Sequence, residues 1–200
     1  SIYVIGLAVS QPLFGLVTDR IGRRPVLLGG FAVFVGASIL LIFADTLGAM
    51  IFLRFMQAVG VGVGTVVARG LIHDHLPPDE ALKAFALLTA AMGFTPVIAP
   101  VVGGYLASLL GMASVFVVLA LLGAGLLLLC VKSIPRDDPV DRDEGQTASL
   151  KGYLSLLHSL RFWGHAGAFG FLQGIVFTLM ATGSVLFQEQ FGLSMQGFSL

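Results

Sequence analysis

Two groups of charged residues in this sequence could do chemistry. One is a single arginine, Arg54, which lies within the otherwise uncharged residues 47–68. The other is the short segment 15–25, in which Asp19 stands among several arginines and glycines. An arginine stays protonated in proteins, so it can pair with a carboxylate, orient water or lower the pKa of a neighbouring acid, but it cannot release a proton itself. Both groups therefore favour ion pairing and control of another group's proton over bond-breaking catalysis.

Neither a catalytic nor a metal-binding arrangement is recognisable. The His, Asp and Glu residues do not have the spacing of metal ligands, no Ser or Cys has a base nearby in the sequence, and no glycine-rich loop follows a strand. The single cysteine, Cys130, excludes an intrachain disulfide framework and a multi-cysteine metal site, and we expect it to be a small apolar filler near a helix end. We therefore expect no enzyme activity, no catalytic residue, no metal and no cofactor.

The composition indicates what kind of protein must position these charges. Of the 200 residues, 56% are hydrophobic and a further 26 are glycine, while 11% are charged, against roughly 25% in an average soluble domain. The formal net charge is +0. These values exclude a soluble enzyme, a disordered chain and a nucleic-acid binder with a basic face, and they predict an all-α, polytopic membrane protein.

Uncharged stretches predict six membrane-spanning helices, because a span needs about 20 mostly apolar residues. The uncharged residues 84–131 are too long for one helix, and the polar, glycine-containing segment 108–114 divides them. A further segment begins near Ser194. The six predicted spans are 1–18, 25–44, 47–68, 84–107, 114–131 and 162–187.

The positive charges predict the orientation of these spans. Ten of the 11 Lys and Arg residues lie in the connections after the first and third spans and in the loop 132–161, whereas the opposite connections hold none. By the positive-inside rule, the positively charged connections are cytoplasmic. The first span then runs from outside to inside. The chain opens within an apolar stretch with no initiator Met, so we expect a piece of a longer transporter that lacks its first helix.

The loop 132–161 is the linker that we expect between two bundles of spans. Its prolines and its run of mixed charge, residues 135–144, predict a solvated and flexible segment. The end of the loop is either a short helix on the membrane surface or a simple connector. The apolar residues that would face the membrane are Leu150, Tyr153, Leu154 and Leu157.

Polar and small residues inside the spans suggest two functional helix faces. The first face, in the span 47–68, suggests a water-lined cavity, unless its arginine reaches the nearby outer surface of the membrane instead. Glycines beside this face allow close packing of another helix. The second, in the span 84–107, is an ordinary kinked packing face or a functional one. The first face holds Arg54, Gln57, Val61, Thr65 and Ala68 beside Gly60, Gly62 and Gly64, and the second holds Gly93, Pro96, Pro100, Gly103 and Gly104.

Three of these motifs resemble signatures of the major facilitator superfamily. Residues 53–60 resemble its fourth-helix signature in proton-coupled members, and residues 93–104 resemble its fifth-helix antiporter signature. The loop that resembles its signature between the second and third helices contains Gly15, Asp19, Arg20, Gly22, Arg23 and Arg24. The resemblance implies a cytoplasmic latch in which Asp74, near the end of the fourth helix, pairs with Arg23. It also implies that Arg54 and Gln57 act in proton coupling and that transport is antiport.

Within the superfamily the chain is most similar to the Bcr/CflA group of drug-resistance antiporters, from that group's second helix to the start of its eighth. Shared features include Gln11 and Pro12 before the loop and the segment 188–194, whereas His73 stands where the group has an arginine. The resemblance implies export of drugs or small amphipathic metabolites by proton antiport through alternating access. A uniporter or symporter of a small metabolite is the alternative. The resemblance further implies a major facilitator fold of about twelve spans and a monomer in a bacterial inner membrane. Its partners would be a small-molecule substrate, protons and the lipid bilayer, with no nucleic acid.

The resemblance also implies a division of the chain and a set of substrate-binding residues. An N-terminal bundle would cover residues 1–131, the cytoplasmic loop residues 132–161, and the start of a C-terminal bundle residues 162–200. Because no Asp or Glu lies within a predicted span, we expect the titrating carboxylate outside this sequence. The candidate substrate-binding residues, each also compatible with plain helix packing, are Thr65, Met92, Gln173, Phe177 and Thr178.

Overall fold

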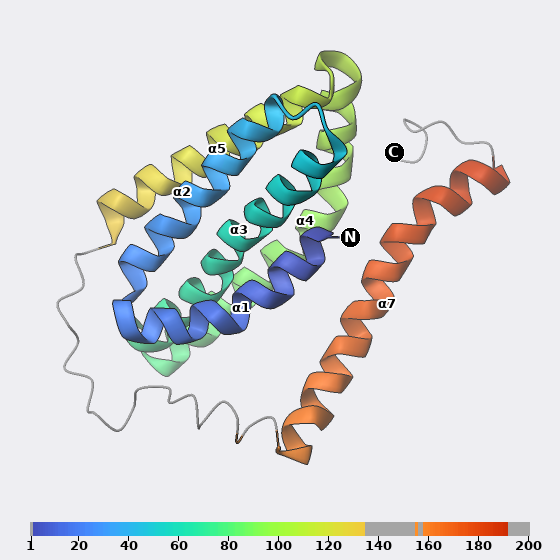
Figure 1. Cartoon of the computed structure of the whole chain (residues 1–200). Helices are drawn as coiled ribbons and strands as arrows, with labels where there is room; N and C mark the ends of the chain where they lie inside the picture. The colour runs from blue at the N-terminus through green and yellow to red at the C-terminus, as the bar shows by residue number, and fades with distance from the viewer. Residues whose placement is uncertain (1, 135–154, 156–157, 192–200) are drawn as a thin grey trace. The chain divides into compact units, whose positions relative to one another are not determined.

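The secondary structure is helical, as the composition predicts. The computed structural model describes residues 2–134, 155 and 158–191, and these residues contain no strand. Each helix overlaps one of the six spans predicted from the sequence. The helices in this part of the chain are α1 (Ile2–Ile21), α2 (Arg23–Ile42), α3 (Leu47–His75), α4 (Pro78–Leu110), α5 (Met112–Ser133) and α7 (Leu160–Phe191) (Figure 1).

Several of these helices are suited to cross a membrane. By length and hydropathy, α2, α3 and α5 each qualify as a span. Helix α4 qualifies as a fourth if its halves, Pro78–Pro96 and Ile98–Leu110, which meet at a bend of 41°, count as one span. The apolar part of α1, Ile2–Thr18, is shorter. The described residues thus form a polytopic helical membrane protein, and the count of six spans stays a prediction.

Local chemistry explains where the helices end. Gly22 and Gly111 have φ angles of 98° and 82°, a backbone conformation that a side chain would strain, and they make the turns between α1 and α2 and between α4 and α5. At the start of α3 the side chain of Thr46 accepts a hydrogen bond from the backbone N–H of Ala49 at 3.3 Å, which caps the helix.

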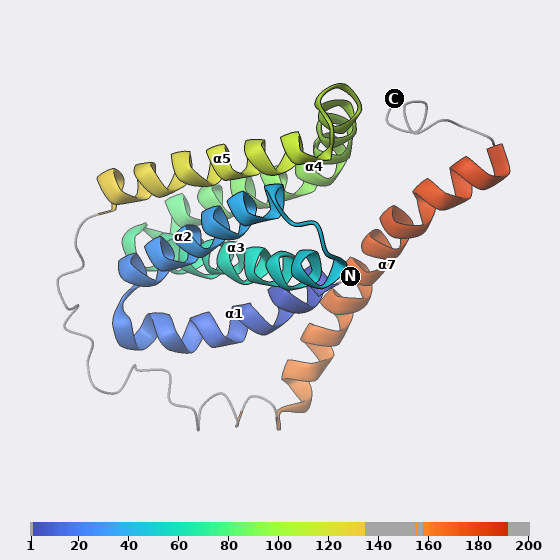
Figure 2. The ribbon, with the colours of Figure 1, turned by 45° about the horizontal axis from the view of Figure 1, so that its top comes forward.

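Helices α1, α2, α3 and α5 pack into a bundle, in which α3 contacts α1 and α2, and α2 contacts α5 (Figures 1 and 2). Cys130 of α5 packs at the edge of the apolar core, in agreement with its expected role as a small filler near a helix end. The buried residues at the centre of this core come from α2 and α3 and are Val26, Leu27, Phe31, Val63 and Val67.

Small residues let the backbones of α1, α2 and α3 approach closely. A Cβ atom added at Gly60 of α3 would lie 2.6 Å from the carbonyl oxygen of Gly30 in α2. A Cβ atom added at Gly62 would overlap Ser10 of α1. The two glycines therefore serve two different neighbours of α3. Contact of this kind is typical of membrane helices, whose association depends on close packing rather than on exclusion of water.

The remaining part of the chain is described separately. Helix α7, of 32 residues, belongs to a second compact unit. The expected surface-helix residues Leu150, Tyr153, Leu154 and Leu157 lie outside the described residues, as do residues 192–200. The predicted division into an N-terminal bundle, a loop and the start of a C-terminal bundle stays a prediction.

Candidate functional site

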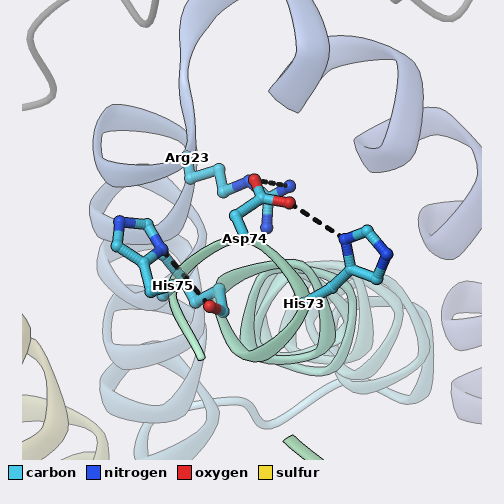
Figure 3. A network of polar contacts seen from close by, with 5 residues as sticks. Arg23, His73, Asp74 and His75 are labelled. Atoms are coloured by element: carbon cyan, nitrogen blue, oxygen red, sulfur yellow. Dashed lines mark hydrogen bonds and ion pairs between the residues drawn. The ribbon is translucent and has the colours of Figure 1, made fainter. Parts of the chain in front are cut away.

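An ion pair joins the start of α2 to the last turn of α3 (Figure 3). The Nη2 atom of Arg23 lies 2.5 Å from the Oδ2 atom of Asp74, and the side chains are 15% and 37% exposed. The Nδ1 atom of His73 lies 3.3 Å from the other carboxylate oxygen of Asp74. The side chain of His75 points away from the pair, with its Nδ1 atom 3.3 Å from the carbonyl oxygen of Leu71. The pairing expected from the sequence is present, and its part in transport stays a prediction.

The guanidinium of Arg23 lies against the backbone of α3 at a glycine. A Cβ atom added at Gly70 would overlap the guanidinium, so the absence of a side chain there makes room for it. The Nε and Nη1 atoms of Arg23 are buried and have no hydrogen-bond partner in the described part of the chain. Arg23 thus depends on Asp74 for compensation of its charge. Sequence reasoning missed Gly70, although its position four residues before Asp74 places it on the same helix face.

The neighbouring arginine binds a different helix. Arg24 donates a hydrogen bond from Nη2 to the carbonyl oxygen of Val131 in the last turn of α5, at 3.0 Å. The final carbonyls of a helix have no partner within it, and an arginine is a favourable donor to them. This contact was not predicted. Gly15 lies within α1, and the side chains of Asp19 and Arg20 lie outside the described part of the structure.

Arg54 lies in the second turn of α3, is half-buried and is bound by neutral groups. It donates from Nη1 to Oε1 of Gln57 at 3.1 Å. Its Cζ atom lies 4.7 Å from the centroid of the Phe116 ring, which α5 supplies. Among the described residues the ion pairs involve Asp74, so no carboxylate described here pairs with Arg54. The arrangement holds a cation inside a spanning helix without neutralising it.

Gln57 continues the polar contacts from Arg54 into α2. Its Nε2 atom donates to Oγ of Ser38 at 2.8 Å, and that hydroxyl donates to the carbonyl oxygen of Phe34 at 2.7 Å. Gln57 is 1% exposed, so it lies in the α2–α3 contact and not on the wall of a water-lined cavity, where the polar stripe suggested it. The difference arises because a buried serine on α2 can satisfy the amide, which the pattern on one helix does not reveal.

The proposed antiporter face lies on α4. Pro96 stands at the end of the first half of this helix, directly before the 41° bend, and Pro100 follows in the second half. A Cβ atom added at Gly93, Gly103 or Gly104 would meet nothing within 4 Å in the described structure. The described residues therefore leave these glycines without a packing neighbour, and the role of this face stays a prediction.

The candidate substrate-binding residues differ in their surroundings. Thr65 is half-buried and donates from Oγ1 to the carbonyl oxygen of Gly62 at 2.9 Å, whereas Met92 is 46% exposed. On α7, Gln173 is half-buried and Thr178 is exposed, and the side chain of Phe177 lies outside the described structure. An apolar hollow of about 310 Å³ between α1, α2 and α3 is lined by none of them. Their role as substrate contacts stays a prediction.

Comparison with known proteins identifies the family to which the sequence is similar. The family model of the Major Facilitator Superfamily matches residues 1–200. Multidrug resistance protein D of Escherichia coli is 32% identical over 80% of this chain and 40% of its own length. The uncharacterized MFS-type transporter YdgK of Bacillus subtilis is 29% identical over 98% of this chain and 50% of its own.

A second multidrug resistance protein of Escherichia coli, MdtL, is 35% identical over 64% of this chain and 33% of its own length. The chain thus spans between a third and a half of these curated relatives. The match of the family model extends over every described helix, including those with the ion pair and with Arg54. The chain belongs to the Major Facilitator Superfamily.

Proposed function

We propose that the full-length protein exports drugs or small amphipathic metabolites in exchange for protons, as a monomer in a bacterial cell membrane. Membership of a transporter superfamily supports transport, and two relatives named as multidrug resistance proteins support this kind of substrate. The observation that carries proton coupling is the state of Arg54, a cation inside a spanning helix whose described partners, Gln57 and Phe116, are neutral.

The uncompensated charge of Arg54 provides a physical basis for this coupling. A charge within a span costs several kcal/mol unless water or a partner compensates it. Such a cation stabilises a nearby carboxylate in its charged form and so lowers the pKa of that carboxylate. A carboxylate from outside this sequence would then exchange its proton with the bulk, and a bound cationic or amphipathic substrate would compete with that proton. Alternating access would carry the proton and the substrate across the membrane in turn, with the bent α4 closing the cavity.

The test uses the full-length protein in everted membrane vesicles with an imposed pH gradient. Addition of an amphipathic drug should dissipate the gradient, and Arg54→Ala should abolish this response because the carboxylate loses its neighbouring cation. Arg161→Ala is the matched control, since it removes an exposed arginine at the start of α7, and it should respond like the wild type. Drug uptake without any change in the gradient would contradict antiport and favour a uniporter.

The ion pair between Arg23 and Asp74 is proposed to act as a latch that stabilises the outward-open state. Replacement Asp74→Asn keeps the shape of the side chain but leaves the guanidinium of Arg23 without its counter-charge. We expect the outward-open population and the transport rate to fall severalfold. Accessibility of single cysteines to a membrane-impermeant reagent from the outer side measures the population. Asp45→Asn, in the exposed turn between α2 and α3, is the control. Unchanged accessibility and transport in Asp74→Asn would contradict the latch.

A further inference from the structure

We infer that Phe116 is a positioning residue that holds the guanidinium of Arg54 at the place where it acts on the exchanging proton. This inference rests on the proposed function and deepens it. It concerns α5, a helix for which neither the sequence motifs nor the proposed function supplies a role beyond packing. The residues that carry it lie in the packed bundle of α2, α3 and α5.

The first observation is the contact between the cation and the ring. The Cζ atom of Arg54 lies 4.7 Å from the centroid of the Phe116 ring, within the limit of about 6 Å for an attractive cation–π contact. Phe116 is 6% exposed. A ring that is enclosed in this way has little freedom to turn aside, and the attraction is stronger where water is excluded.

The second observation is that the guanidinium also has a hydrogen-bonding partner, which differs from the aromatic ring of Phe116. Its Nη1 atom donates to Gln57, whose amide is itself fixed by Ser38 of α2. A guanidinium donates hydrogen bonds within its plane and stacks through its face, so the amide and the ring do not compete for it. Helices α2 and α5 therefore restrain the side chain of α3 from two directions.

The third observation concerns the other charges around Arg54. On α1, Tyr3 is the titratable group that interacts electrostatically with it, and α2, α3 and α5 present no described acid to it. The field at an approaching carboxylate then depends on where the guanidinium lies. Because the interaction between two charges falls with their separation, movement of the Arg54 guanidinium away from that carboxylate raises the pKa of the carboxylate.

The experiment compares Phe116→Leu and Phe116→Tyr in the full-length protein, with drug-driven proton exchange measured as a function of pH. Phe116→Leu should move the midpoint of the pH profile upward by about half a unit or more, because the cation is no longer held. Phe116→Tyr keeps an aromatic face and should retain the wild-type midpoint. An unchanged midpoint in Phe116→Leu would overturn the inference, because a side chain that only packs would alter the yield or the rate alone.

The matched control is Phe34→Leu. Phe34 is as enclosed as Phe116, at 8% exposed, and it packs against Gly123 of α5, but none of the cations that the structure describes lies over its ring. Its replacement removes a similar volume from the contact between α2 and α5. We expect Phe34→Leu to lower the apparent melting temperature and to leave the midpoint of the pH profile at its wild-type value. A shift of the midpoint in Phe34→Leu equal to that in Phe116→Leu would overturn the inference, because general loosening of the bundle would then explain both.

A second measurement separates this inference from the proposed function. Thermal unfolding is compared for Arg54→Met, Phe116→Leu and the double variant in detergent, which requires no transport. If the double variant loses less stability than the sum of the losses in the two single variants, the contact is supported. If the losses of stability simply add, the inference is overturned. If the wild type shows no drug-driven proton exchange, the proposed proton antiport fails. The thermal cycle then decides alone whether Phe116 holds Arg54.

Discussion

At the residue scale, Gln57 occupies the central place in the polar contacts inside the bundle. Its oxygen accepts from Arg54 and its nitrogen donates to Ser38, so both ends of a fully buried amide are used. A buried polar group that loses its partner costs free energy, because it cannot turn to water instead. The side chain of Gln57 therefore links the orientation of Arg54 to the hydrogen bond between α2 and α3.

This link predicts that Ser38→Ala destabilises the protein by about 1–3 kcal/mol, because Nε2 of Gln57 loses its acceptor. The apparent melting temperature in detergent measures the effect. Thr89→Ala is the matched control, since Thr89 also donates to the carbonyl four residues before it but is exposed on α4. Equal melting temperatures for Ser38→Ala and Thr89→Ala would contradict the prediction.

At the element scale, α3 organises the bundle because it contacts both α1 and α2 at glycines. Gly60 lies against the backbone of α2 at Gly30 and Phe34, and Gly62 lies against Ser10 of α1. A backbone atom cannot rotate out of the way as the end of a long side chain can. The crossing of these helices therefore depends on the absence of a single methyl group.

We predict that Gly60→Ala separates α2 from α3 and costs about 1–3 kcal/mol, the usual penalty for overpacking. Thermal unfolding and the yield of folded protein measure it. Gly36→Ala on α2 provides the comparison, since its added Cβ meets nothing within 4 Å and alanine favours a helix by up to about 1 kcal/mol. A melting temperature at or above the wild-type value in Gly60→Ala would refute this account of the contact.

The helices and their contacts show which features can be predicted from a sequence. Runs of apolar residues and positions such as Gly22 act locally, so helix positions and that turn could be predicted. The pairing of Arg23 with Asp74 was predicted through the family motif. The contact of Arg54 with Phe116 joins residues on different helices and depends on how far each helix is rotated about its axis. No pattern on one helix contains that rotation, which is also why the burial of Gln57 was missed.

At the scale of the whole molecule, the positive charges predict how the bundle is inserted. The turn between α2 and α3 contains Asp45 and no positive charge, whereas the turn between α3 and α4 lies beside Arg69 and Lys83. We therefore predict that the first turn faces outward and the second faces the cytoplasm. These two turns stand at opposite ends of α3, so one experiment tests both.

The measurement is labelling of single cysteines in intact cells with a membrane-impermeant maleimide, in a full-length protein that is otherwise free of cysteine. Asp45→Cys should be labelled from outside, and Asp79→Cys should be labelled only after the membrane is opened. Both positions are exposed, so a failure to react reports the side of the membrane and not burial. Labelling in the reverse pattern would invert the proposed orientation.

The two adjacent arginines after Gly22 have a consequence for how the chain can vary in length. Arg23 binds α3 and Arg24 binds the end of α5, so each must keep its angular position on α2. Because an inserted residue turns the following part of a helix by about 100°, one insertion here would direct each arginine toward the wrong neighbour. Homologues should therefore conserve the number of residues between Gly22 and the core of α2.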